Sequence, residues 1–170
     1  KMKKLFYLLC LPFLLVNCGS DTIPLAEMPY QLQFTIPAGL SPFENWYFLF
    51  EDIPNNKNTV FNSASLSDEE IIEIRGKSAN LTALFTNIEF DFIHDISIRI
   101  FKEDPDDYRE LFYRTEIPFN ISGDLGLIGG ETDVQQYLQD DTYNILIKII
   151  PRASTPEVID CRLDYVIFAR

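Results

Sequence analysis

The segment Ile88-Glu89-Phe90-Asp91-Phe92-Ile93-His94-Asp95-Ile96-Ser97-Ile98-Arg99-Ile100 carries the strongest period-two pattern of the chain. Apolar side chains recur at its even positions, mostly with polar residues between them. Because successive side chains of a strand point to opposite faces, the pattern predicts one half-buried strand, or two strands joined by a bend near His94 and Asp95. It favours His94 as a hydrogen-bonded core residue over a catalytic base. In a regular strand Asp95 points to the opposite face, so the two residues would not form a dyad.

Shorter alternating segments recur along the rest of the chain. They predict strands at residues 30–36, 45–50, 70–75, 108–117, 143–149 and 159–167. Polar turn clusters such as residues 52–58 and 102–107 separate them. The segment 67–84 is ambiguous, because Ser67-Asp68-Glu69-Glu70 resembles the capping box of a helix while Gly76 would soon interrupt that helix.

Two further segments have helical features. Residues 80–85 are long enough for a single helical turn. Thr132 and Gln135 have the spacing of a capping box, which predicts a two-turn helix ending before Asp140. About seven to nine short strands with no strand–helix–strand alternation predict a mostly β fold. The expected architecture is an antiparallel β-sandwich, either immunoglobulin-like or jelly-roll, with one or two short helices.

The first residues have the pattern of an export signal. Lysines precede an apolar run from Leu5 to Val16, and the run ends at Asn17-Cys18-Gly19-Ser20. The run contains Pro12 and is shorter than the about 20 residues that cross a bilayer. This stretch resembles the signal and lipobox of bacterial lipoproteins, although Asn17 departs from the usual small residue. A cut at Cys10 would leave only about four apolar residues before it. An ordinary signal peptide with an incidental cysteine is the alternative.

The resemblance implies where the chain resides. Residues 1–17 would be a signal peptide, residues 18–29 a lipidated tether, and residues 30–170 the β-sandwich domain. Cys18 would carry the lipid, palmitate included, and hold the protein to the bilayer. Gly19 follows the cysteine instead of aspartate, which in lipoproteins of enteric type implies an outer-membrane anchor, on the periplasmic or the cell-surface face.

Charge and cysteine content narrow the classes of function. The 170-residue chain has a net charge of −12, which becomes −15 when the three lysines of residues 1–17 are removed. A surface this acidic repels phosphate backbones, so nucleic acid is not an expected partner. If Cys10 leaves with the signal peptide and Cys18 is acylated, Cys161 is the remaining free cysteine and has no internal disulfide partner. Its place in an alternating segment predicts a buried, unreactive thiol.

Acidic turns are the candidate metal ligands. Asp104, Asp106 and Asp107, or Asp140 and Asp141, would offer the carboxylate oxygens that Ca²⁺ prefers. Their spacing matches no EF-hand, and aspartates in hairpin turns commonly serve the turn itself. No other cofactor is predicted.

Aromatic residues supply the candidate ligand site. Trp46, Tyr47 and Tyr113 would form a platform for a sugar, although Trp46 shares a face with Phe48 and Phe50 and is expected in the core. No catalytic motif occurs, so an enzyme is not predicted. The sequence predicts an envelope lipoprotein that binds or assembles with an envelope protein or a glycan, either directly or by adding a strand to an open sheet edge. The alternative is a small glycosidase-like hydrolase that uses paired carboxylates.

Overall fold

The computed structural model describes residues 25–85, 88–121 and 123–170. Eight antiparallel strands form one continuous sheet in the order β1-β8-β3-β6-β5-β4-β7-β2. The strands are β1 (Ala26–Ile36), β2 (Trp46–Pro54), β3 (Ile74–Leu84), β4 (Ile93–Phe101), β5 (Tyr108–Arg114), β6 (Asp124–Gly129), β7 (Thr142–Pro151) and β8 (Ile159–Ala169). The expectation of a mostly antiparallel β fold is confirmed.

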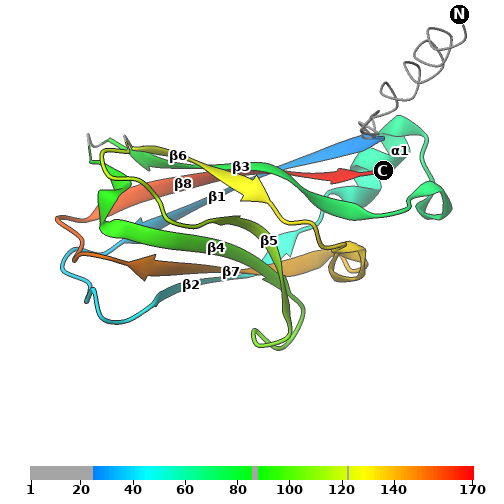
Figure 1. Ribbon diagram of the computed structural model, residues 1–170. Helices are drawn as coiled ribbons and strands as arrows, with labels where there is room; N and C mark the ends of the chain where they lie inside the picture. The colour runs from blue at the N-terminus through cyan, green and yellow to red at the C-terminus, as the bar shows by residue number, and fades with distance from the viewer. Residues whose placement is uncertain (1–24, 86–87, 122) are drawn as a thin grey trace, which may run out of the picture.

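The sheet folds over on itself at the junction of β5 and β6. Only Phe112 with Gly129 and Tyr113 with Ile128 pair across this junction. The half β1-β8-β3-β6 therefore packs face to face against the half β2-β7-β4-β5, as Figure 1 shows. Every connection except the β4–β5 hairpin passes from one half to the other. This strand order is that of a jelly roll and not of an immunoglobulin domain.

The core lies between the two halves and explains the alternation in the sequence. Inward side chains of β4, β7 and β8 are almost fully buried, among them Ile98, Ile147 and Leu163. Close approach of backbones at the fold-over requires glycine. A Cβ on Gly76 would lie 2.3 Å from Leu111 O, and one on Gly129 would lie 2.2 Å from Gly76 O. These glycines let the two halves meet where the sheet turns the corner.

Short helical elements differ most from expectation. Helix α1 (Lys57–Ala64) occupies part of a segment that we predicted as a turn. Its sequence has low helix propensity, but the buried side chains of Lys57 and Phe61 fix it against the sandwich. The capping box at Ser67 forms and opens a single 3₁₀ turn, η2 (Asp68–Glu70). The other short turns are η3 (Phe90–Phe92) and η4 (Gln135–Leu138), so the two-turn helix predicted there is only one turn.

Two strand boundaries were also predicted wrongly. Strand β3 covers residues 74–84, so the strand expected at 70–75 begins later and the helical turn expected at 80–85 is extended chain. Pairing with β8 decides this segment against its local pattern. Strand β1 starts at Ala26, which pairs with Ala169, so residues 26–29 belong to the sheet and not to a tether.

His94 is the main correction within the opening segment. The pairing of β4 with β7 shifts between Ile93 and Asp95, and this irregularity turns His94 out to solvent while Ile93 enters the core. His94 is exposed, and its Nδ1 lies 2.8 Å from Asp95 Oδ1. The two side chains therefore meet, contrary to the expectation from a regular strand.

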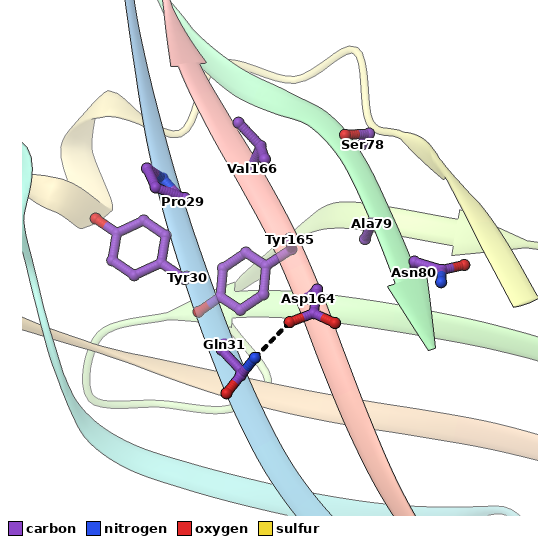
Figure 2. Close-up of a pocket in the computed structure, with 9 residues that line it drawn as sticks. All are labelled: Pro29, Tyr30, Gln31, Ser78, Ala79, Asn80, Asp164, Tyr165 and Val166. Carbon is purple, nitrogen blue, oxygen red and sulfur yellow. Dashed lines mark hydrogen bonds between the residues drawn. The ribbon is translucent and has the colours of Figure 1, made fainter. Parts of the chain in front are cut away.

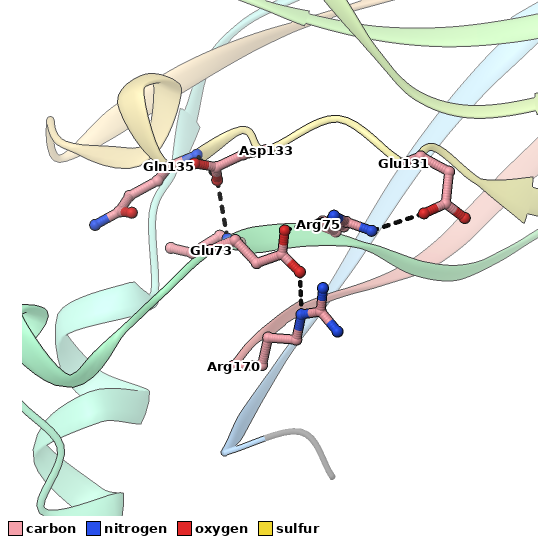
Figure 3. A network of polar contacts seen from close by, with 7 residues as sticks. Glu73, Arg75, Glu131, Asp133, Gln135 and Arg170 are labelled. Atoms are coloured by element: carbon pink, nitrogen blue, oxygen red, sulfur yellow. Dashed lines mark hydrogen bonds and ion pairs between the residues drawn. The ribbon is translucent and has the colours of Figure 1, made fainter. Parts of the chain in front are cut away.

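A polar network fastens the last residue of the chain to the start of β3. Glu73 lies at its centre and accepts from Arg75 Nη2 at 2.6 Å and from Arg170 Nε. Figure 3 shows the contact with Arg170. Arg75 also pairs with Glu131 at 2.7 Å. The Glu73 side chain is 11% exposed, against 92% for Glu131. Glu73 therefore holds two cations in a place with little water.

We predict that Glu73→Gln lowers the free energy of unfolding by about 2 kcal/mol, because it removes the largely buried carboxylate charge that Arg75 and Arg170 share. Glu131→Gln is the matched control and should change stability by at most about 0.5 kcal/mol, since the exposed pair is screened by water. Urea unfolding at neutral pH measures both. Equal losses in the two variants would contradict the role given to Glu73.

Three tyrosines meet in the interior. The hydroxyls of Tyr143 and Tyr165 lie 2.7 Å apart, and the Tyr30 ring stacks on Tyr165 at 5.3 Å between centroids. Burial raises the pKa of Tyr30 to about 12. Burial also raises the pKa of Tyr143 and of Tyr165. The native state therefore favours the neutral phenols, whereas the unfolded chain releases their protons near pH 10.

The contribution of the three tyrosines to stability should consequently stay level up to about pH 10 and fall between pH 10 and 12, where only the unfolded chain ionises these phenols. Urea unfolding at pH 8 and pH 11 measures the loss. Because other groups also titrate there, the comparison variant is Tyr143→Phe, which should lose about 1 kcal/mol at pH 8 and then show a smaller further loss at pH 11. An unchanged pH dependence in that variant would refute the assignment.

Candidate functional site

Four of the connections lie together at one end of the sandwich. The pairing of Ala26 with Ala169 and of Ile36 with Ile159 fixes the direction of the strands. The β1–β2, β3–β4, β5–β6 and β7–β8 loops therefore share one end, on the left of Figure 1, while the start of β1, the C-terminus and α1 lie at the other. We call the described residues of these loops, 37–45, 85, 88–92, 115–121, 123 and 152–158, the loop end.

Hydrogen bonds join the four loops into one surface. Successive loops are linked by Gly39 N to Thr155 O at 3.0 Å, Arg152 N to Phe92 O at 2.8 Å, and Phe90 N to Ile121 O at 3.0 Å. The Arg152 side chain also donates to Ile117 O. Backbone groups of loops need partners, and here the neighbouring loops supply them. The loop end is therefore one connected surface and not a set of four independent loops.

Each of these loops holds one large apolar side chain out to solvent. The exposed fractions are 93% for Phe43, 97% for Phe85, 67% for Phe119 and 57% for Val158. The Phe119 ring is the one with a cationic neighbour, since Arg152 Cζ lies 4.5 Å from its centroid. Exposed apolar side chains that gather on one surface indicate a binding surface more strongly than the same residues scattered singly.

Sequence reasoning missed this surface. We read the Pro42-Phe43 and Pro118-Phe119 segments only as loops, because prolines end strands and turn segments lack a period. The available signal was the residue type itself, since phenylalanine is uncommon at exposed positions of loops. What could not be read from the sequence is that topology brings four separate loops to the same end.

The predicted aromatic platform is only partly assembled. Trp46 is 6% exposed and donates from Nε1 to Ser41 O at 2.8 Å, so it belongs to the core. Tyr47 and Tyr113 do share the outer face of β2-β7-β4-β5. They lie at the two ends of one row, in which Tyr47 pairs with Lys148, Lys148 with Ser97, and Ser97 with Tyr113. Three strand spacings place them about 14 Å apart.

Charged side chains fill the middle of that outer face. Arg99 lies over the Tyr108 ring at 4.0 Å, and its Nε donates to Ser97 Oγ at 3.2 Å. Ser97 in turn donates to Glu110 at 2.7 Å. The hollow beside Tyr113 has a volume of only about 150 Å³. The face is therefore a mixed polar and aromatic surface whose groups mostly bind one another.

The acidic turn between β4 and β5 borders an open hollow of about 430 Å³, together with Lys102 and Tyr137. Asp104 Oδ1 accepts from Asp106 N at 2.9 Å, as an aspartate that initiates a turn does. Asp107 lies 3.7 Å from Arg109. Within residues 25–85, 88–121 and 123–170, no three His, Cys, Asp or Glu side chains gather as a metal ion requires. The calcium hypothesis therefore gains no support from the geometry.

A hollow of about 560 Å³ lies over β1, β8 and β3 (Figure 2). Its longer polar side chains are already paired with groups of the sheet. Gln31 Nε2 donates to Asp164 Oδ1 at 2.7 Å, and Asn80 Nδ2 donates to the Asp124 carboxylate and to Thr82. Such cross-strand pairs stabilise a sheet, so we assign this hollow a structural role.

Comparisons with known proteins identify no family. No family model matches the chain, and no curated protein matches it. Among solved structures, the chain is similar to one described as "Crystal structure of decameric BFDV Capsid Protein", with 12% identity and a TM-score of 0.31 over 85% of this chain and 96% of that one. A similarity this low says nothing about function. Among the described residues, no helix has the length and hydropathy needed to span a membrane.

The cysteines divide between the two parts of the chain. Cys18, the predicted lipidation site, lies outside the described residues. Cys161 is fully buried, as expected, and burial beside Asp160 raises the pKa of its thiol to about 12. The thiolate is the reactive form of cysteine, so this residue is a poor nucleophile near neutral pH.

We therefore predict that Cys161 in the folded protein reacts with Ellman's reagent at pH 8 only when the protein opens, at least about 100-fold more slowly than in urea. The measurement uses a variant in which Cys10 and Cys18 are replaced by serine, so that Cys161 is the remaining thiol. Rapid stoichiometric labelling of the folded variant would show that the thiol is accessible and would reopen its role as a nucleophile.

Proposed function

We propose that this protein is a lipoprotein of the bacterial outer membrane, acylated at Cys18, which acts as a binding or assembly module through its loop end. The resemblance of residues 3–20 to a lipoprotein signal supports the anchor. The jelly roll supports the module, because a compact disulfide-free sandwich can present loops on a rigid frame.

The position of β1 relates the anchor to the loop end. Ala26 lies only eight positions after Cys18, so the chain between them reaches at most about 28 Å. Strand β1 then runs away from that end for 11 residues, or about 36 Å. An anchor at Cys18 would thus hold the base of the sandwich near the bilayer and direct the loop end away from it.

The exposed apolar side chains of the loop end are the observation that carries the binding role. The opposite end covers most of its apolar residues, including Val134, Tyr137 and Leu138, and leaves Leu25 and Ile72 exposed. A phenylalanine that served only stability would be expected in the core, because burying its ring gains about 1.5–3 kcal/mol. Their display on four linked loops supports contact with a partner.

The hydrolase alternative has less support. It needs two acids about 5 to 10 Å apart in a cleft that holds a sugar. Asp104 and Asp107 border a hollow together, but both are exposed and engaged with the turn or with Arg109. A binding module makes better use of the geometry.

The anchor predicts that the protein incorporates radiolabelled palmitate and floats with membranes, and that Cys18→Ala abolishes both, because two or more acyl chains provide the membrane affinity. Cys10→Ala is the matched control and should behave as the unchanged protein. Membrane partitioning that survives Cys18→Ala would disprove the lipid anchor.

A further inference from the structure

The charge around the exposed apolar side chains identifies the kind of partner that fits them. The loop end carries the exposed carboxylates Glu44, Glu89, Asp91, Glu116 and Glu157, and Arg152 is its one described guanidinium. None of these five carboxylates lies within ion-pair distance of a described cation. The loop end is thus both apolar and negatively charged.

The opposite end is also acidic, but it differs in how many of its carboxylates are paired. Of the nine ion pairs found among the described residues, seven join residues at or near the opposite end, for example Lys57 with Asp68 and Lys102 with Asp140. Six of the acidic residues at that end are thereby paired with a cation of the chain, whereas none of the five at the loop end is. Because removing an unpaired carboxylate from water costs free energy, a surface that covers the loop end must bring positive charges.

This condition decides between two classes of partner. An anionic bilayer would repel the five carboxylates, although it would accept the phenylalanines. A protein can place apolar recesses and basic side chains on one surface, and the linked loops provide the rigid counterpart that such recesses need. Aromatic anchors surrounded by a charged rim are also the usual composition of a protein interface.

We infer that the loop end docks a protein that offers apolar recesses for Phe43, Phe85 and Phe119 within a rim of lysine and arginine side chains. The inference rests on the proposed binding role of the loop end and does not depend on acylation of Cys18. Phe43 and Phe85 are the anchors, since they are almost completely exposed and would bury the largest area. Glu44 and Glu116 lie beside Phe43 and near Phe119 in sequence and pair with the rim.

The test uses the purified full chain and two synthetic amphipathic peptides, one of leucine and lysine and the other of leucine and glutamate. The leucine–lysine peptide should bind, and replacing Phe43, Phe85 and Phe119 together by serine should weaken its binding at least about tenfold, since interface aromatics often contribute more than 1.4 kcal/mol. The double variant Leu49→Ser with Ile128→Ser is the matched control. It removes two apolar side chains that are 51% and 50% exposed on the sheet faces.

Three results would overturn the inference. The first is equal binding of the leucine–lysine peptide to the triple variant, which would reduce the effect to net charge. The second is tighter binding of the leucine–glutamate peptide. The third is binding of the unchanged protein, but not of the triple variant, to vesicles containing phosphatidylglycerol, which would make the loop end a membrane contact. Loss of palmitate labelling would overturn the anchor alone and leave these results unaffected.

Discussion

The jelly roll depends on burial of one apolar interior between its two halves. Within that interior, Tyr143 of one half and Tyr165 of the other share a hydrogen bond of 2.7 Å. Tyr30 closes the group with an edge contact to Tyr143 and a stacked contact to Tyr165. Because the described residues contain no disulfide, packing across this interior must supply the stability that a crosslink would otherwise add.

The same packing also brings together the two edge strands of the sheet. Strands β1 and β2 end the sheet, and rings from both meet between them, with Phe34 lying 5.0 Å from Phe48 between centroids. Each edge is also interrupted, β1 by Pro29 and β2 by an irregularity before Ile53 with the charged residues Glu51 and Asp52 beside it. Proline, irregular pairing and charge are the usual protections against strand addition. The loop end is therefore a better binding surface than either edge.

The sequence predicted the strands where alternation and pairing agree. The strands at β1, β2, β7 and β8 follow directly from inward apolar residues, since every second side chain enters the core. The prediction failed where a contact from outside the segment decides the outcome. Residues 80–84 are extended because β8 and β6 flank them, and α1 begins within the predicted turn 52–58 because burial of Lys57 and Phe61 fixes it. At His94 one extra residue in the pairing of β4 with β7 exchanged the inward and outward sides of the strand, and the alternation of residues in the sequence does not reveal such a shift.

The candidate site shows the same division between local and distant causes. The sequence predicted burial of Trp46 because Trp46 shares a strand face with Phe48 and Phe50. Tyr47 lies on the opposite face of that strand and is exposed. The loop end could not be found in this way, because its loops are spread over more than 100 positions of the sequence. Only the order of the strands in the sheet brings these loops together. Knowledge of the strand order would have been enough to place them together.

The distribution of charge gives the two ends different properties. Near the start of β1, networks such as Glu73 with Arg75 and Arg170 bring acids and bases together, although that end as a whole remains acidic. At the loop end the five exposed carboxylates form no ion pair with a described cation. In the proposed role they would raise the rate of encounter with a basic protein. The two ends thus differ in how many of their acids are paired, and this difference is the reason that the proposed partner is expected to bring its cations to the loop end.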